Sequence, residues 1–176
     1  NVAEVFSHKD VYIGSGYIDT DSKILVRMIP VNKEETIEKA IPRLVKQAVF
    51  LRKEFFDNPK ETNAYRVING EGDGLPGLIA DYYNGAVSLQ IYSLGLQPYI
   101  DIVIKALRDS LQNVKWIYQR NEIRLAKTAS AKLVFGKNLP TKIEFLENGL
   151  KFSTDLVNGQ KTGFFLDQRE NRQLIR

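Results

Sequence analysis

The sequence predicts an α+β fold in which helices pack on a mixed or antiparallel sheet. Three observations indicate this class. Short segments with apolar residues at every second position, typical of strands, recur along the chain. Two segments, 38–55 and 97–111, instead place apolar residues at helical spacing. Between residues 64 and 119 the strand–strand–helix–strand order differs from the regular alternation of a complete doubly wound domain.

Composition limits the classes of protein that the chain can belong to. Its 176 residues suffice for one large domain or two small ones, and 43% hydrophobic with 26% charged residues is an ordinary globular balance. The absence of cysteine excludes a disulfide framework, a thiolate metal site and a cysteine nucleophile within this chain. With His8 as the single histidine, we expect no metal site and no Ser-His-Asp triad. No signal peptide or long apolar run is present, so we expect a soluble, cytoplasmic protein without a membrane partner.

Charge is distributed unevenly along the chain. The formal net charge is +4, but residues 112–142 contain seven basic residues and one acid, Glu122. That stretch therefore carries +6 and the remainder −2. Such a stretch is either a solvated basic face or a surface for an anionic partner, and its composition leaves both readings open.

The first thirty residues have the pattern of strands. Segments 2–6, 11–13 and 23–29 are strand-like, and the polar turn 7–10 separates the first two. Two or three short strands do not form a stable sheet alone, so we expect this domain to be incomplete at its N-terminus. The period then becomes helical from about Glu38, where Pro42 is tolerable close to the helix start. Asn58-Pro59 ends the helix.

Residues 64–92 predict three strands, at 65–68, 78–82 and 86–92, with Asn84-Gly85 as a hairpin turn. The glycine-rich segment 69–77 between the first two is not a phosphate-binding loop, because it lacks the Gly-Lys-Ser/Thr motif and no helix follows it. Its acids at positions 71 and 73 would also repel a phosphate. We therefore expect a structural turn.

The last third predicts a helix, a strand and a hairpin. A helix at 97–111 precedes a strand at 114–119, and residues 142–152 form a hairpin that turns at Asn148-Gly149. Asp167, with Glu170 three residues later, resembles a capping box that starts a further helix. That helix has barely begun at Arg176, so we expect the chain to be truncated there.

The segment 158–172, Asn-Gly-Gln-Lys-Thr-Gly-Phe-Phe-Leu-Asp-Gln-Arg-Glu-Asn-Arg, is the most unusual in the chain. Glycines flank Lys161-Thr162, two aromatic residues follow, and a helix begins with Asp-Gln-Arg. These residues fit a ligand-binding turn. They fit equally well a scaffold in which Phe164 and Leu166 are core residues and Asp167 caps a helix, so the pattern alone does not choose.

The same segment carries a resemblance. Residues 159–172 resemble the signature that opens the methyltransferase domain of the S-adenosylmethionine-dependent 23S rRNA cytosine-C5 methyltransferases. Residues 65–77, Tyr-Arg-Val-Ile-Asn-Gly-Glu-Gly-Asp-Gly-Leu-Pro-Gly, resemble the signature of their central domain. Residues 8–16 and 22–27 are similar to later strands of their N-terminal PUA domain, a small RNA-binding β-barrel. The three matches occur in the family's order and span nearly the whole chain.

The resemblance implies a mechanism whose main parts lie outside this chain. In the family, a cysteine attacks C6 of cytosine and C5 is then methylated. The nucleophilic cysteine, the glycine-rich cofactor loop and the proline-containing catalytic loop would all follow Arg176. We therefore expect no catalytic residue here, no S-adenosylmethionine bound to this fragment, and no activity of the fragment alone.

The predicted organisation is a truncated PUA-like barrel (1–31), a central mixed-sheet α/β domain (32–147) and the first hairpin and helix start of a Rossmann-like methyltransferase domain (148–176). The complete protein would use S-adenosylmethionine and act on ribosomal RNA. A homodimer is one possible oligomeric state of it. The resemblance implies that six residues border cofactor and target base: Lys161, Thr162, Phe164, Asp167, Gln168 and Arg169. Basic composition leads us to expect RNA contacts at Lys23, Arg27, Arg120, Arg124 and Lys127.

Two other functions remain open from the sequence. The chain could be a stand-alone, non-catalytic RNA-binding or ribosome-associated module, and the length of the encoding reading frame separates this reading from the first. A metabolite-binding domain that uses the glycine-rich turn is a weaker candidate, because no convergent set of polar residues accompanies the turn.

Overall fold

The structure is a computed structural model that describes residues 2–32, 34–121 and 131–175. Its N-terminal strands form an antiparallel sheet in the order β1-β2-β3, comprising β1 (Val2–Phe6), β2 (Tyr12–Ile18) and β3 (Val26–Ile29). β2 is longer than predicted because it continues through Gly14 and Gly16. A Cβ at Gly16 would lie 2.3 Å from the carbonyl oxygen of Arg27 on β3, so this close strand approach requires glycine. These three strands form an open sheet, so the described residues do not show the closed barrel that was expected.

The centre of the protein is a five-stranded mixed sheet in the order β4-β5-β6-β7-β8. β6 and β7 are parallel, whereas the other neighbouring pairs are antiparallel, which confirms the predicted mixed sheet. β8 was not predicted, because its four residues are too short to show a period. The strands are β4 (Ala64–Asn69), β5 (Leu78–Tyr83), β6 (Ala86–Ile91), β7 (Trp116–Asn121) and β8 (Lys132–Phe135).

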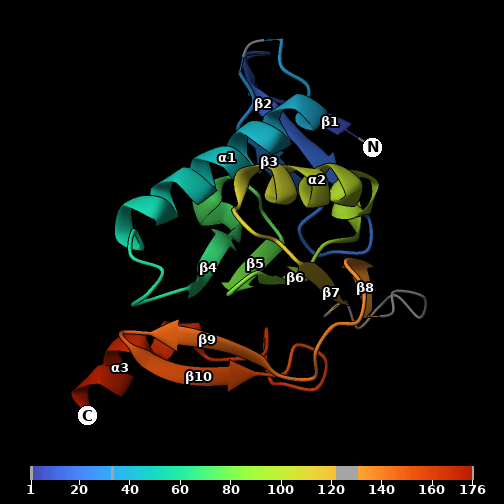
Figure 1. Ribbon diagram of the computed structural model, residues 1–176. Helices are drawn as coiled ribbons and strands as arrows, with labels where there is room; N and C mark the ends of the chain where they lie inside the picture. Colours follow the sequence, from blue (N-terminus) through green and yellow to red (C-terminus); the bar gives the residue numbers. More distant parts are fainter. Residues whose placement is uncertain (1, 33, 122–130, 176) are drawn as a thin grey trace.

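Two helices cover one face of this sheet, α1 (Ile37–Phe55) and α2 (Ile100–Ser110) (Figure 1). The 3-10 helix η2 (Leu94–Tyr99) leads into α2, so the helix predicted from residue 97 begins as a tighter turn that contains Pro98. Pro42 is the sixth residue of α1, beyond the first turn where it was expected. Apolar side chains of both helices bury against the sheet and form the main core.

The opposite side of the sheet is covered by the C-terminal part of the chain (Figure 1). The predicted hairpin is confirmed as β9 (Ile143–Glu147) and β10 (Leu150–Thr154), with positive φ angles at both turn residues, Asn148 and Gly149. The short η3 (Leu166–Gln168) and α3 (Arg169–Leu174) follow. The expectation that Asp167 caps the last helix is wrong: Gln168 holds the N-cap position, and Asp167 lies within η3 and pairs with Lys161.

The glycine-rich turn is structural, as predicted. It contains the 3-10 helix η1 (Gly70–Asp73), and the Asp73 carboxylate accepts two hydrogen bonds from the Arg52 guanidinium of α1, at 2.5 and 2.7 Å. The same carboxylate accepts a hydrogen bond from the backbone N–H of Asn69 at 2.6 Å. The turn also anchors the N-terminal sheet, because the buried Tyr17 hydroxyl donates to the carbonyl of Pro76.

A carboxylate at the entrance to α1 makes stability dependent on pH. Glu35 accepts hydrogen bonds from the Arg43 guanidinium at 2.7 and 3.0 Å and from the backbone N–H of Asn32 at 2.8 Å. The Arg43 hydrogen bond, followed by that of Asn32, lowers the pKa of Glu35 from 4.5 to about 2. Because the folded-state pKa is lowered, the stabilisation is complete above pH 4.5 and is lost as pH falls toward 2.

We therefore expect Glu35→Gln to lower the melting temperature at pH 6, and the difference from the wild type to shrink steadily as pH falls from 4.5 to 2. Melting curves followed by circular dichroism over this range measure it. A difference that is the same at pH 2 as at pH 6 would show that the Glu35 charge does not stabilise the fold.

Candidate functional site

The segment predicted to be functional, 158–172, lies against the central sheet and is joined to it by a buried carboxylate. Asp81 on β5 is fully buried and stands opposite Arg66 on β4 in the antiparallel register. The Arg66 guanidinium donates to both Asp81 oxygens, at 2.8 and 3.2 Å. The Thr162 hydroxyl donates to the same carboxylate at 2.5 Å. The Asp81 side chain therefore links β4, β5 and segment 158–172 through hydrogen bonds.

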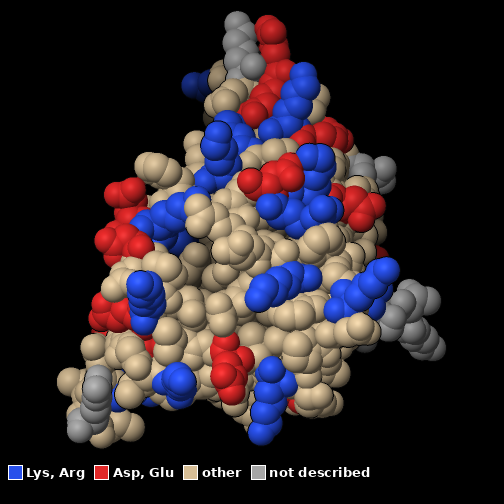
Figure 2. Space-filling model, in the orientation of Figure 1, with Lys and Arg blue, Asp and Glu red and all other residues tan. Residues whose placement is uncertain are grey.

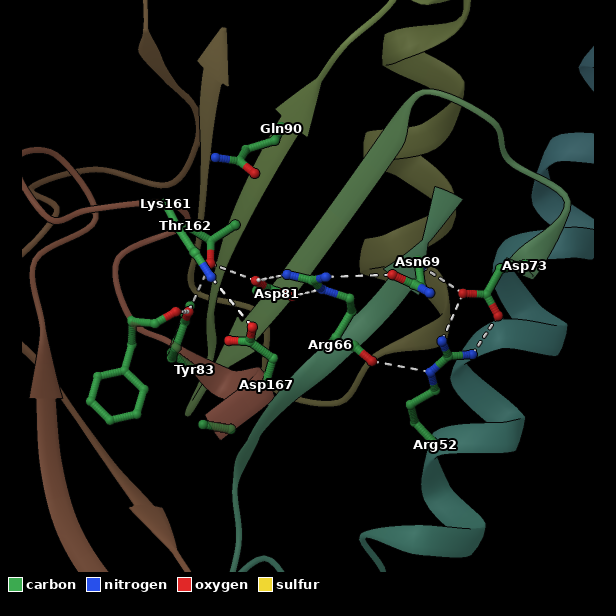
Figure 3. A network of polar contacts seen from close by, with 12 residues as sticks. Arg52, Arg66, Asn69, Asp73, Asp81, Tyr83, Gln90, Lys161, Thr162 and Asp167 are labelled. Atoms are coloured by element: carbon green, nitrogen blue, oxygen red, sulfur yellow. Dashed lines mark hydrogen bonds and ion pairs between the residues drawn. The ribbon is translucent and has the colours of Figure 1, made fainter. Parts of the chain in front are cut away.

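Tyr83, two residues after Asp81 on the same face of β5, extends this network. Its hydroxyl lies 3.1 Å from the Thr162 hydroxyl and donates to the carbonyl of Phe164 at 3.5 Å. Burial, with the nearby Asp81 charge second, raises the pKa of Tyr83, so the phenol stays protonated. Figure 3 shows the continuous path of polar contacts from Tyr83 and Thr162 through Asp81 and Arg66 to Asn69.

A second buried carboxylate holds the end of the segment. Glu147, the last residue of β9, is 2% exposed and accepts two hydrogen bonds from the Arg172 guanidinium, both at 2.7 Å. The Arg169 guanidinium lies 3.7 Å from the same carboxylate and donates to the carbonyl of Ala64 at 2.8 Å. The Arg169 guanidinium also lies over the ring of Phe56, 4.5 Å from its centroid, and only 20% of this side chain is exposed.

The structure divides the six predicted cofactor-facing residues into two groups. Thr162 is 1% exposed, Phe164 packs in the second core cluster, and Arg169 contacts Glu147, Ala64 and Phe56. These three hold the segment in place. The exposed group, which can reach a ligand, is Lys161, Asp167 and Gln168.

The exposed residues already have partners within the chain. Lys161 has a positive φ of 52°, and its ammonium lies 3.3 Å from Asp167 and 4.3 Å over the ring of Phe165. Burial alone would raise the pKa of Asp167, but the hydrogen bond and charge of Lys161 outweigh it and lower that pKa. The Gln168 amide oxygen accepts a hydrogen bond from Asn171 at 2.6 Å. A ligand at this surface would have to compete with these contacts.

This segment does not enclose a space of cofactor size at its C-terminal end. The cavity beside Arg169 and Arg172 has a volume of about 10 Å³, which is room for about one water molecule. The guanidinium groups of Arg169 and Arg172 suit a carboxylate or phosphate, but the described residues around them form no pocket that could surround a nucleoside. A cofactor at this face would therefore need walls beyond those that this end of the segment provides.

The predicted RNA-binding residues do not form one patch in the described structure. Lys23 is exposed before β3, whereas Arg27 on β3 is 13% exposed and lies 3.4 Å from Glu71. Arg120 on β7 donates to the carbonyl of Gly159 at 2.8 Å, so it supports the 158–172 segment. Arg124 and Lys127 lie outside the described residues.

Asp81, Arg66, Tyr83, Glu147 and Arg172 were not singled out from the sequence. A signal existed for the first pair, because Arg66 and Asp81 are opposite charges in two successive strands joined by a turn. No comparable signal existed for Glu147, whose partner Arg172 is 25 residues away. Among the described residues, no group of three or more metal-ligating side chains is close enough to hold a metal ion. None of the described helices combines the length and apolarity needed to cross a membrane.

Known proteins are similar to this chain in both sequence and fold. Ribosomal RNA large subunit methyltransferase I from Alteromonas mediterranea is 35% identical over 176 residues, which is 98% of this chain and 44% of that protein. The protein of the same name from Aliivibrio fischeri is 33% identical over 175 residues, again with 44% of its length covered. A comparison with models of protein families finds no match.

Solved structures agree with this result. A Streptococcus mutans protein described as a candidate S-adenosylmethionine-dependent methyltransferase superimposes with a TM-score of 0.84 at 25% identity, over 99% of this chain and 45% of that one. SMU.776, a candidate methyltransferase in complex with S-adenosylhomocysteine, gives 0.83 at 27% identity, over 98% and 44%. The S-adenosylmethionine dependence and the S-adenosylhomocysteine complex are descriptions of these two neighbours. The chain spans somewhat less than half the length of the relatives it matches, and nearly all of it is similar to the N-terminal portion of ribosomal RNA large subunit methyltransferases.

Proposed function

We propose that the chain is the N-terminal portion of an S-adenosylmethionine-dependent ribosomal RNA cytosine-C5 methyltransferase, in which it binds RNA and supports the catalytic domain. The observation that carries this proposal is the 35% identity over almost the whole chain to a ribosomal RNA large subunit methyltransferase. The finer assignment to cytosine C5 rests on the resemblance of segments 65–77 and 159–172 to that family's signatures. The complete protein would act in the cytoplasm.

The three-part organisation belongs to the same proposal. Residues 1–31 would be part of a PUA-like RNA-binding domain, 32–147 the central domain, and 148–176 the opening of the methyltransferase domain. RNA contacts would come from Lys23 and from the basic stretch 112–142. The Asp81 and Glu147 networks would fix the opening segment of the methyltransferase domain on the central sheet, so that Lys161, Asp167 and Gln168 face the cofactor side.

Methyl transfer by the complete protein tests the function directly. Large-subunit RNA lacking its own modifications is incubated with the protein encoded by the whole gene and with S-adenosylmethionine carrying a labelled methyl group. We expect label on C5 of one or a few cytosines, located by nuclease digestion and mass spectrometry. Label on another base would overturn the cytosine-C5 assignment, and no label in RNA would favour a non-catalytic ribosome-associated module.

The 176-residue chain by itself is expected to transfer no methyl group and to bind S-adenosylmethionine negligibly. The reason is that the resemblance assigns the cofactor loop and the nucleophilic cysteine to sequence beyond Arg176. Calorimetric titration of the chain with S-adenosylmethionine measures the affinity, with the complete protein as positive control. A micromolar dissociation constant for the short chain would contradict the expectation.

A further inference from the structure

A cavity of about 770 Å³ opens on the helix-covered side of the central sheet, and none of the residues that line it belongs to the Asp81 network. Its volume is within the range of about 300–1,000 Å³ typical of small-molecule sites. It lies beyond the last residues of both helices, Phe55 of α1 and Ser110 of α2. The start of β4 and the end of β5, which carry Tyr65 and Tyr82, line it. Figure 2 shows this face hollowed below α1, with basic side chains on both sides of the hollow.

One wall of the cavity is a row of aromatic rings. Phe56 stacks on Tyr65 with ring centroids 4.7 Å apart and planes inclined by 9°, and Tyr65 lies 5.4 Å from Tyr82. Tyr65 and Tyr82 are direct partners in the β4–β5 register, which places both rings on the same face of the sheet. Arg169 lies over Phe56, 4.5 Å from its ring centroid, so the row has a fixed cation beside it.

The rest of the lining is basic and amide-rich. Three exposed lysines line the cavity, Lys53 from the end of α1, Lys60 from the following loop and Lys115 before β7, against one acid, Asp57. The segment after α2 adds the amides of Gln112 and Asn113. The Tyr82 hydroxyl donates to the carbonyl of Gln112 at 3.4 Å, so this amide-bearing segment is tied to the aromatic row.

This combination identifies the chemistry of an occupant. Aromatic rings at the edge of a core, or exposed lysines on a surface, would each by themselves need no explanation, but here both line the same cavity. Flat π faces together with cations are the means by which proteins hold unpaired bases and their phosphates. A base within a double helix cannot enter such a cavity, because it is stacked between its neighbours.

We propose that this cavity binds an unpaired nucleotide of single-stranded RNA, with the base against Tyr65 and Tyr82 and the flanking phosphates at Lys53, Lys60 and Lys115. The identification of the nucleic acid as RNA rests on the proposed function. The site itself rests on the described residues. In the complete protein it would hold a single-stranded part of the substrate beside Arg169 of the 158–172 segment.

The lysines are tested by charge reversal. The 176-residue chain is titrated into a fluorescein-labelled, single-stranded RNA of about ten nucleotides, a length within the range that single-strand sites cover. The variant Lys53→Glu/Lys60→Glu/Lys115→Glu is expected to bind roughly tenfold more weakly or worse, and its plot of log K against log salt to be shallower by about 2, or about 0.7 per lost phosphate contact. The matched control is Lys39→Glu/Lys105→Glu/Lys151→Glu, three exposed lysines that do not line this cavity, with the same change in net charge. It should weaken binding roughly threefold or less, through long-range charge alone.

The aromatic row is tested by a readout of stacking. An RNA of the same length carries the fluorescent base 2-aminopurine, whose emission falls when it stacks on an aromatic ring. We expect the wild type and Tyr82→Phe to quench this emission, since both keep the ring. Tyr82→Leu, which keeps an apolar side chain, should quench little and bind roughly fivefold more weakly or worse. Circular dichroism melting curves test whether each variant is folded.

The outcomes separate the cavity from the proposed function. The cavity proposal is overturned if the two lysine triples weaken binding equally, if duplex RNA binds as tightly as the single strand, or if Tyr82→Leu quenches as the wild type does. Methyl transfer by the complete protein combined with any of these results would leave the proposed function standing without this site. If the complete protein binds single-stranded RNA through the cavity but methylates no RNA, the cavity proposal is supported and the proposed function is overturned.

Discussion

Replacing Glu147 with alanine is expected to lower the free energy of unfolding by about 4 kcal/mol, because it removes one partner of a buried ion pair and leaves the other in place. The carboxylate is 2% exposed, and the side chains of Arg169 and Arg172 are 20% and 21% exposed. Without Glu147, two guanidinium groups remain close together in a poorly hydrated space. For a chain of this length the loss corresponds to a fall in melting temperature of roughly 8–16 °C.

A neighbouring acid on the same strand is the control for this prediction. Glu144 lies three residues earlier on β9, and its side chain is exposed. Glu144→Ala should change the free energy of unfolding by about 0.5 kcal/mol or less, as is usual for surface positions. Urea denaturation followed by circular dichroism measures both variants. Equal effects of the two substitutions would mean that the Glu147 ion pairs do not hold the C-terminal segment.

Asp81→Ala is expected to lower the free energy of unfolding by about 3 kcal/mol. The substitution leaves the Arg66 guanidinium and the Thr162 hydroxyl without their shared acceptor. The value lies at the lower end of the range for buried pairs because the Arg66 side chain is 35% exposed and water can replace part of the lost interaction. The loss is measured as a shift in the urea midpoint.

Asp109→Ala provides the comparison for Asp81. The Asp109 side chain is 61% exposed and pairs with Lys105 on the surface of α2, so its removal should cost about 0.5 kcal/mol or less. Thr162→Val adds a second check, since it removes a hydroxyl from the same network with little change of shape. If Asp81→Ala unfolds at the wild-type urea concentration, the polar network contributes nothing to the packing of segment 158–172 on the sheet.

These networks change how the predicted cofactor residues are interpreted. The resemblance implied that Arg169 borders the cofactor and the target base, and in the structure its guanidinium contacts Glu147, Phe56 and the carbonyl of Ala64. Burial lowers the pKa of this guanidinium, and the Glu147 charge partly offsets the effect. A role for Arg169 at the cofactor remains a prediction. A loss of activity in an Arg169 variant would have to be separated from a loss of stability.

Local patterns in the sequence predicted those elements whose formation depends on short-range physics. The helical spacing of apolar residues predicted α1 and α2, because each helix must turn one apolar face toward a sheet. Asn148-Gly149 predicted the β9–β10 turn, because both residues accept the positive φ angles that a tight hairpin needs. The prediction that Asp167 caps the last helix was wrong, because Asp167 lies within the 3-10 helix η3 and pairs with Lys161.

The sequence by itself determined the fold class, the main strands and helices, and a resemblance that the relatives of this chain support in its coarser form. Only the tertiary structure decided what the polar side chains do. Asp81 and Thr162 are 81 residues apart, and Glu147 and Arg172 are 25 apart, so no local period relates them. The physical reason is that a buried charge requires a partner wherever the fold brings one near, and the choice of partner depends on how sheets and helices pack. The cavity beside Tyr65 and Tyr82 has the same origin, because it exists where two helices end above the sheet.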